Sequence, residues 1–145
     1  MRLRSTRGGE RGAALVEFSI AALVFLTSVF AVIEFGRLLW THNALTDAAR
    51  RGARYAVTHA PDPGKAASVV VYGTAADGAN SPVVHGLTAK NVEVVYSGDF
   101  NAGQGTVRVS VKDYDFNFVV PLLGTKIRMP DYATTLTAES AGTMP

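Results

Sequence analysis

The sequence predicts an α+β fold in which one long N-terminal helix carries a small, mostly antiparallel sheet of about four strands. Three observations support this class. Residues 13–33 form an apolar run in which only Glu17 is charged. Residues 34–58 continue with apolar residues at helical spacing and without proline. After Pro61, several short segments alternate apolar and polar residues, which is typical of strands that bury one face.

The apolar run has the length of a membrane span. Its 21 residues from Ala13 to Ile33 would form a helix about 30 Å long, the thickness of a bilayer's hydrocarbon core. Four basic residues precede it: Arg2, Arg4, Arg7 and Arg11. This asymmetry predicts a cytoplasmic N-terminus and an external chain after about Ile33. A lone carboxylate within the span is costly, at roughly 3 kcal/mol near its middle.

Three interpretations of this segment compete. It could be an ordinary anchor, with Glu17 reaching toward the basic side. It could be a removable secretory signal peptide, although the run exceeds the usual apolar core of about 7–15 residues and no small-x-small site follows it. The third is a leader that is cut before the apolar segment, between Gly12 and Ala13, so that the apolar helix stays on the protein.

Beyond the span the helix becomes amphipathic. One stripe at helical spacing is apolar or small, and it comprises Leu38, Leu45, Ala49, Gly52 and Ala56. Trp40 lies just beyond the predicted membrane exit, which suits an interfacial position. We expect the helix to end near His59, because Pro61 and Pro63 cannot continue it.

The remaining residues predict a head of strands and loops. Pro61 to Gly64 should form a turn and residues 73–88 a surface loop, and residues 98–105 should connect two strands as a hairpin. Residues 106–112 point odd positions inward, whereas Tyr114, Phe116 and Phe118 are even, so we expect a break near Lys112 and Asp113. Pro121 should end that run. The expected strands span 68–72, 91–96, 106–112 and 131–139.

Length and composition limit the possible functions. We divide the chain into a basic leader (1–12), a transmembrane helix (13–35), its amphipathic continuation (36–60) and a β-rich head (61–145). The head is too small for an enzyme core and a separate binding domain. No cysteine is present, which excludes disulfides and thiol chemistry. Because no phosphate loop, metal-ligand spacing or nucleophile triad is visible, we expect no enzyme activity, catalytic residue, cofactor, metal or small-molecule substrate.

The arginines of the helix do not predict nucleic-acid binding, because no aromatic stacking platform accompanies them and the net charge is only +2. Two pairs are spaced for contacts on one helix face: Glu34 with Arg37, and Asp47 with Arg50. We expect both to be solvated surface pairs that contribute well under 1 kcal/mol, rather than a binding site.

Three blocks of the sequence, in order, resemble the TadE-like family. They are Arg-Gly-Ala-Ala-Leu-Val-Glu-Phe at 11–18, Ile-Glu-Phe-Gly-Arg-Leu-Leu at 33–39, and Ala-Ala-Arg-Arg-Gly-Ala-Arg-Tyr-Ala at 48–56. Members of this family are pseudopilin-type minor components of tight-adherence (Tad/Flp-type) pilus systems. Phe18 stands where the major pilins often have tyrosine, so it favours the pseudopilin side.

The resemblance implies a pilin-like fold and a processing pathway. A prepilin peptidase would cut between Gly12 and Ala13 on the cytoplasmic side, and a side chain at the cut residue would hinder a tight pocket. Glu17 would then pair with the new amine of Ala13, on its own chain or a neighbour, and with Phe18 would set the register of subunits in the membrane. The implied partners are the peptidase, other pilins and pseudopilins, the pilus assembly platform and the membrane.

The resulting hypothesis is a TadE-like pseudopilin that is needed for assembly of an adhesive pilus. It would be held in the inner membrane by one span, with its head in the periplasm, and after processing it would stay there or join the pilus. The alternative is an uncleaved, signal-anchored binding module of an envelope or secretion complex. A membrane-tethered enzyme is the third interpretation.

Overall fold

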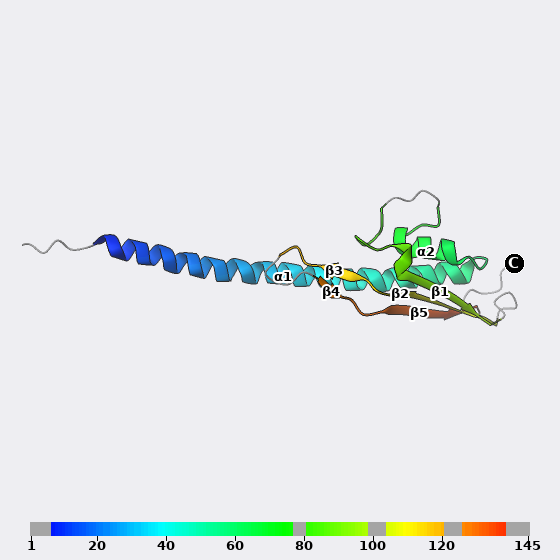
Figure 1. The fold of residues 1–145 in the computed structure, drawn as a ribbon. Helices are drawn as coiled ribbons and strands as arrows, with labels where there is room; N and C mark the ends of the chain where they lie inside the picture. Colours follow the sequence, from blue (N-terminus) through cyan, green and yellow to red (C-terminus); the bar gives the residue numbers. More distant parts are fainter. Residues whose placement is uncertain (1–6, 77–80, 99–103, 121–125, 139–145) are drawn as a thin grey trace, which may run out of the picture.

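The computed structural model describes residues 7–76, 81–98, 104–120 and 126–138, with side chains from residue 12 onward. Two helices, a short 3-10 helix and five strands follow one another (Figure 1): α1 Arg7–Thr58, α2 Pro63–Tyr72, η1 Ala89–Asn91, β1 Val92–Ser97, β2 Thr106–Val111, β3 Asp115–Asn117, β4 Lys126–Arg128 and β5 Tyr132–Thr137. The α+β class with a long N-terminal helix is confirmed. The strands form two antiparallel sheets, of three and two strands, where the sequence suggested about four strands in one.

Some of the predictions fall on residues that the structure does not describe. They concern most of the hairpin loop after Gly98, the end of a run at Pro121, and the last residue of the final strand at Glu139. The described part of that final strand, β5, lies within the predicted range.

α1 begins earlier than the sequence suggested. It starts at Arg7, so residues 7–12 of the basic leader continue the helix. Its end at Thr58 agrees with the prediction, which rested on Pro61 and Pro63. The hydroxyl of Thr58 donates to the carbonyl of Arg54 at 3.0 Å and satisfies one of the last backbone acceptors of the helix.

The predicted strand at residues 68–72 is wrong, because these residues form the second half of α2. Asp62 caps the start of this helix, and its carboxylate accepts from the Lys65 N–H at 3.0 Å. Pro63 occupies the first helical position, and Gly73 ends the helix with a left-handed φ of 77°. Tertiary packing outweighs the β preference of this valine-rich segment, since Val69, Val70 and Val71 are all buried.

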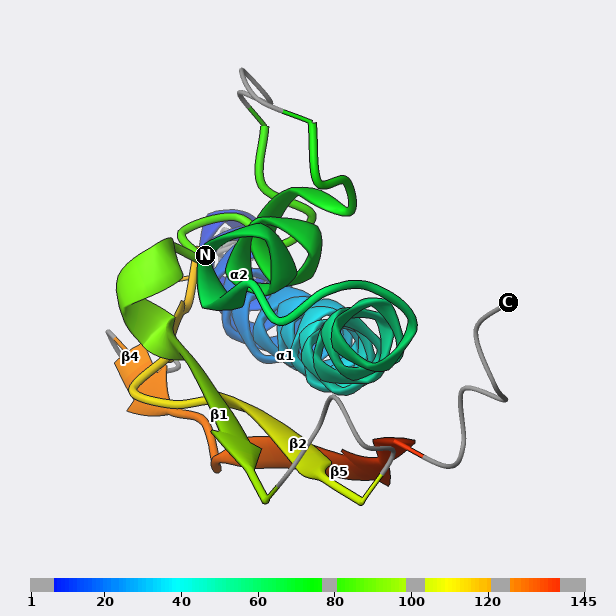
Figure 2. The ribbon, with the colours of Figure 1, turned by 90° about the vertical axis from the view of Figure 1, so that its right-hand side faces the viewer.

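The C-terminal half of α1 lies between α2 and the three-stranded sheet. Figure 2, viewed along α1, shows α2 on one side of this helix and the sheet on the other. The strand order is β1-β2-β5, with both neighbouring pairs antiparallel. In the central strand, Val109 pairs with Val94 on one side and Thr134 on the other. Its odd positions are buried as predicted, although Ser110 is buried as well.

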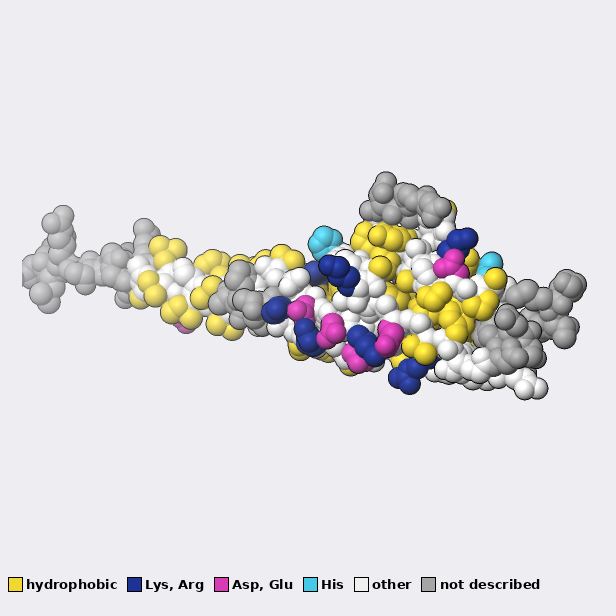
Figure 3. Space-filling view, turned by 45° about the vertical axis from the view of Figure 1, so that its right-hand side comes forward, with side chains coloured by type: hydrophobic (Ala, Val, Ile, Leu, Met, Phe, Trp, Pro, Cys, Tyr) yellow, Lys and Arg dark blue, Asp and Glu magenta, His cyan; other side chains and the backbone are white. Residues whose placement is uncertain are grey.

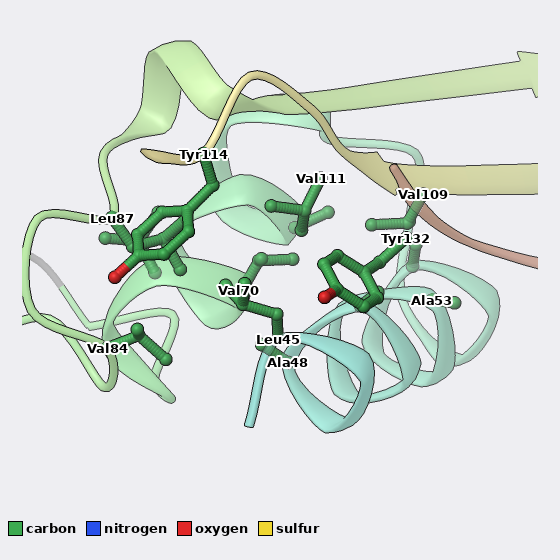
Figure 4. Packing of buried hydrophobic residues seen from close by; sticks show 14 of the residues in the cluster. Leu45, Ala48, Ala53, Val70, Val84, Leu87, Val109, Val111, Tyr114 and Tyr132 are labelled. Carbon is green, nitrogen blue, oxygen red and sulfur yellow. The ribbon is translucent and has the colours of Figure 1, made fainter. Parts of the chain in front are cut away.

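Figure 4 shows the core that these layers enclose. Leu45, Ala48 and Ala53 of α1 meet Val70 of α2 and Val109 of β2 there, and all five side chains are essentially inaccessible to solvent. The predicted stripe of α1 faces this core, with Leu45, Ala49, Gly52 and Ala56 buried and Leu38 half-buried.

Gly52 permits the close approach of the two helices. A β-carbon at this residue would lie 2.2 Å from Cγ2 of Val70, which is less than any real contact allows. The side-chain volume of residue 52 therefore sets the distance between α1 and α2.

The predicted break after β2 is confirmed. Asp113 has a φ of 53°, and beyond it the buried positions become even, with Tyr114 and Phe116 inward. The chain then forms the β3–β4 hairpin, which lies along α1 between the three-stranded sheet and the apolar half of the helix (Figure 1).

The segment predicted as a surface loop, residues 73–88, is only partly on the surface. Val84 and Leu87 are buried in the core. The hydroxyl of Tyr114 donates to the carbonyl of His85 at 2.8 Å and fixes this segment to the chain that leads into the hairpin.

Candidate functional site

The apolar half of α1 is exposed in the isolated chain. Within the described residues, the helix is long and apolar enough to cross a membrane, and none of its most apolar window is buried in the protein. Large side chains such as Phe18, Phe25 and Val32 are 66–73% exposed. Figure 3 shows hydrophobic side chains along the thin end of the molecule. Such a surface is stable only against lipid or other apolar chains, so α1 is a candidate single-pass membrane anchor.

Most polar side chains of this half are satisfied within the helix. The hydroxyls of Ser19, Thr27 and Ser28 each donate to the carbonyl four residues earlier, at 2.7–2.8 Å. Such bonds let hydroxyl groups enter lipid without losing hydrogen bonds.

Glu17 is the exception. It is exposed, and its carboxylate has no hydrogen bond or ion pair among the side chains that the structure describes. Ala13 lies four residues earlier and therefore on the same helix face, one turn closer to the N-terminus of α1. The structure thus leaves the acceptor capacity of Glu17 available for a group outside the described fold, within reach of position 13.

Gly12 and Ala13 lie inside α1 and are both exposed. A peptidase would need an extended bond here, but the backbone is helical, so the helix would first have to unwind. Three glycines in residues 8–12 make unwinding easier, because each lowers helix stability by about 1 kcal/mol relative to alanine. A β-carbon at Gly12 would meet nothing within 4 Å, so the fold itself does not require glycine at this position.

Glu34 is not the solvated surface residue that the sequence predicted. Its side chain is 4% exposed and pairs with the guanidinium of Arg37 at 2.6 Å. The second carboxylate oxygen accepts from the backbone N–H of Val119 at 3.1 Å. Arg37 also lies over the ring of Phe116, at 5.2 Å from its centroid. The predicted pair therefore exists, but it fastens the β3–β4 hairpin to α1.

The burial of Glu34 could not be predicted from local spacing, because Val119 is 85 residues away in the sequence. A buried carboxylate that accepts hydrogen bonds from both a backbone N–H and an arginine holds a loop in place, which a solvated surface pair does not do. The other predicted pair behaves as expected: Asp47 and Arg50 lie 3.6 Å apart with both side chains more than half exposed.

A second group of charges covers the hairpin. Asp115 accepts from Arg128 at 3.2 Å and from Lys126 at 3.3 Å, and Arg128 also pairs with Asp113 at 2.9 Å. Arg128, followed by Lys126, holds the pKa of Asp115 below its ordinary value. Figure 3 shows alternating acidic and basic side chains midway along the molecule, between the apolar end and the head.

His42 links two elements of the head. The Nδ1 atom of His42 lies 2.8 Å from the hydroxyl of Tyr132 and connects α1 to β5. Burial raises the pKa of Tyr132. Among the described residues, no three side chains of the types that hold metals lie close enough to share an ion.

Comparison with known proteins finds a family match for part of α1. Residues 12–54 match the family described as TadE-like protein. The match confirms the resemblance seen in the sequence, over a segment that lies wholly within α1 and amounts to less than a third of the chain. No curated protein and no solved structure matches the chain.

Proposed function

We propose that this chain, which carries the TadE-like segment in α1, is a pseudopilin of a tight-adherence pilus system. It is made as a precursor, anchored in the inner membrane by residues 13–35, trimmed by a prepilin peptidase between Gly12 and Ala13, and needed for assembly of an adhesive pilus. The head lies in the periplasm. The chain is not an enzyme: it works by packing against other proteins, and the catalysis is performed on it by the peptidase.

The observation that carries this proposal is the state of Glu17. It is the one polar side chain of residues 13–33 without a partner within the described structure, on a helix whose apolar surface is exposed. An unpaired carboxylate costs roughly 3 kcal/mol near the membrane centre. Cleavage before Ala13 creates a positive amine one helical turn away, which offsets that cost by pairing with Glu17 on the same or a neighbouring chain.

Gly12 supports the position of the cut. The fold has open space where its side chain would be, so the absence of a side chain serves a group outside the fold, such as the pocket of a peptidase. The basic leader before it favours the cytoplasmic side of the membrane.

The experiment that tests this proposal is intact mass and N-terminal sequencing of the chain from membranes, with and without the peptidase. Two substitutions are compared: Gly12→Leu, next to the proposed cut, and Gly36→Leu as the matched control. Both glycines are exposed on α1 with open space at the β-carbon position, so neither change disturbs the head.

We expect the parent chain and Gly36→Leu to begin at Ala13, and Gly12→Leu to begin at Met1. Without the peptidase, all three should begin at Met1. A parent chain that still begins at Met1 in the presence of the peptidase would contradict the proposal and favour an uncleaved, signal-anchored module of an envelope complex. A chain that begins after residue 33 would instead identify a secretory signal peptide.

A further inference from the structure

The position of the β3–β4 hairpin along α1 is fixed by Glu34. The backbone N–H of Val119 donates to the Glu34 carboxylate at 3.1 Å, and Phe116, on β3, lies beneath the Arg37 guanidinium. Long side chains on a helix incline toward its N-terminus, so the Glu34 carboxylate lies no farther from the apolar half than its own Cα. Val119 therefore lies beside the first turn of α1 that follows the apolar run.

This position places the hairpin at the level of the membrane surface if α1 spans the bilayer. Ala13 to Ile33 fill the hydrocarbon thickness of about 30 Å, so Glu34 lies at its outer boundary. The headgroup layer extends roughly 5–8 Å farther. Arg37 is about 4.5 Å beyond Glu34 along the axis, so the hairpin between Phe116 and Val119 lies within that layer.

The surface of the hairpin is suited to this layer. Val119 is 71% exposed and Ile127 on β4 is 45% exposed, and Ile33 and Phe35, which flank Glu34 in α1, are 52% and 59% exposed. Trp40, at 61% exposure, lies about 9 Å beyond Glu34 along the axis, just beyond this layer.

Net charge does not draw the hairpin toward the headgroup layer. The hairpin and its anchor carry three acidic side chains, Glu34, Asp113 and Asp115, and three basic ones, Arg37, Lys126 and Arg128. They pair with one another at 2.6–3.3 Å and leave no excess of either sign.

We propose that the β3–β4 hairpin rests on the outer leaflet of the membrane, with Val119 and Ile127 in contact with lipid. The occupant of this surface is thus the bilayer that α1 crosses, and the proposal depends on the membrane-spanning part of the proposed function. It is independent of processing and of pilus assembly. The hairpin acts as a second membrane contact that sets the depth of the span.

The test uses single cysteines, because the chain has none of its own. The full chain is placed at low density in zwitterionic phosphatidylcholine vesicles and labelled at one site with an environment-sensitive fluorophore. Two sites probe the proposal, Val119→Cys and Ile127→Cys. The matched control is Val95→Cys on β1, which has nearly the same exposure as Ile127 (43% against 45%) but lies in the three-stranded sheet, farther from the apolar end of α1 (Figure 1). Phe25→Cys, in the middle of the apolar run, reports the span itself.

Quenching is measured with lipids that carry a nitroxide near the headgroup or deep in the acyl chain. We expect the headgroup nitroxide to quench Val119→Cys and Ile127→Cys severalfold more than Val95→Cys, and the deep nitroxide to quench Phe25→Cys. Equal quenching of Val119→Cys and Val95→Cys, with Phe25→Cys quenched, would overturn the hairpin contact and leave the span intact. If Phe25→Cys is not quenched, the span fails, and this proposal fails with it.

Two further outcomes would also overturn the proposal. Quenching that appears only after anionic lipid is added would replace apolar contact by charge attraction. Disulfide cross-linking between two copies through Val119→Cys at this low density would identify the surface as an interface with a second copy of the chain.

Discussion

Replacing Gly52 by alanine should destabilise the head. A β-carbon at residue 52 would lie 2.2 Å from Cγ2 of Val70 and 3.4 Å from Cγ1 of Val109. Val70 is fully buried, and a valine in a helix has one strongly preferred side-chain rotamer, so it cannot turn aside cheaply. α1 and α2 must therefore move apart.

The expected loss follows from two opposing terms. Overpacking a core costs about 1–3 kcal/mol, and a contact of this severity belongs at the upper end. Alanine returns about 1 kcal/mol through its higher helix propensity. The net loss in the free energy of unfolding is about 2 kcal/mol. For a head of this size with a urea dependence of about 1 kcal/mol per molar, the unfolding midpoint falls by about 2 M.

The assay is urea unfolding of the full chain in detergent micelles, followed by near-ultraviolet circular dichroism of the buried tyrosines, Tyr114 and Tyr132. Gly36→Ala is the matched control, because a β-carbon there meets nothing within 4 Å, so only the helix-propensity gain remains and the midpoint should hold or rise. The double variant Gly52→Ala with Val70→Ala removes the clashing methyl group, so it should lose less stability than the sum of the single variants. A Gly52→Ala midpoint at or above that of the parent, or strict additivity in the cycle, would refute the packing argument.

Two predictions concern the hairpin. Glu34→Ala removes the acceptor of the Val119 N–H and should speed hydrogen exchange at that amide by roughly ten- to a hundredfold, since a hydrogen bond to a charged group contributes about 1.5–3 kcal/mol. Glu34→Gln keeps an acceptor oxygen, so it should speed exchange less. Equal exchange at Val119 in the parent and both variants would contradict the role of Glu34 as the anchor of the hairpin. Because Arg128 and Lys126 lower the pKa of Asp115, its carboxylate stabilises the hairpin above the unfolded pKa of about 3.9, and this contribution is lost as the pH falls through the lower, folded value. The protection factors of the β4 amides, which correct for the slower intrinsic exchange at low pH, should therefore fall at acid pH in the parent chain, with little such change in Asp115→Asn.

The features that the sequence predicted correctly are those with a long or strict period. The extent of α1 beyond the apolar run, its small-sided stripe and the inward positions of β2 follow from spacing alone, because each face meets one environment along its whole length. The break at Asp113 was equally visible, since no strand can keep one buried face when the parity of its apolar residues changes.

α2 was mispredicted because its β-branched run, Val69 to Val71, was weighed above its ends. Asp62 and Pro63 at the start and Gly73 at the end are ordinary helix boundaries, and they were legible in the sequence. What the sequence could not provide is the reason this segment is helical, namely the room that Gly52 leaves on α1 for Val70.

The role of Glu34 was also beyond local sequence reasoning. Its spacing to Arg37 predicted the ion pair correctly, but its burial depends on a backbone N–H that the fold brings from residue 119. A contact between a side chain and a distant backbone N–H leaves no periodic signal in the sequence, so the anchor of the hairpin became visible only in the structure.

The continuity of α1 has a mechanical consequence. The helix passes from its apolar half into the core of the head without a proline, and the 25 residues after Ile33 rise about 38 Å. A change of roughly 10° in the tilt of the apolar half, within the range that spanning helices adopt, displaces the far end of the helix by about 7 Å. If the apolar half spans a bilayer, α1 is therefore a lever arm, in which a small change of tilt in the lipid becomes a large displacement of the head.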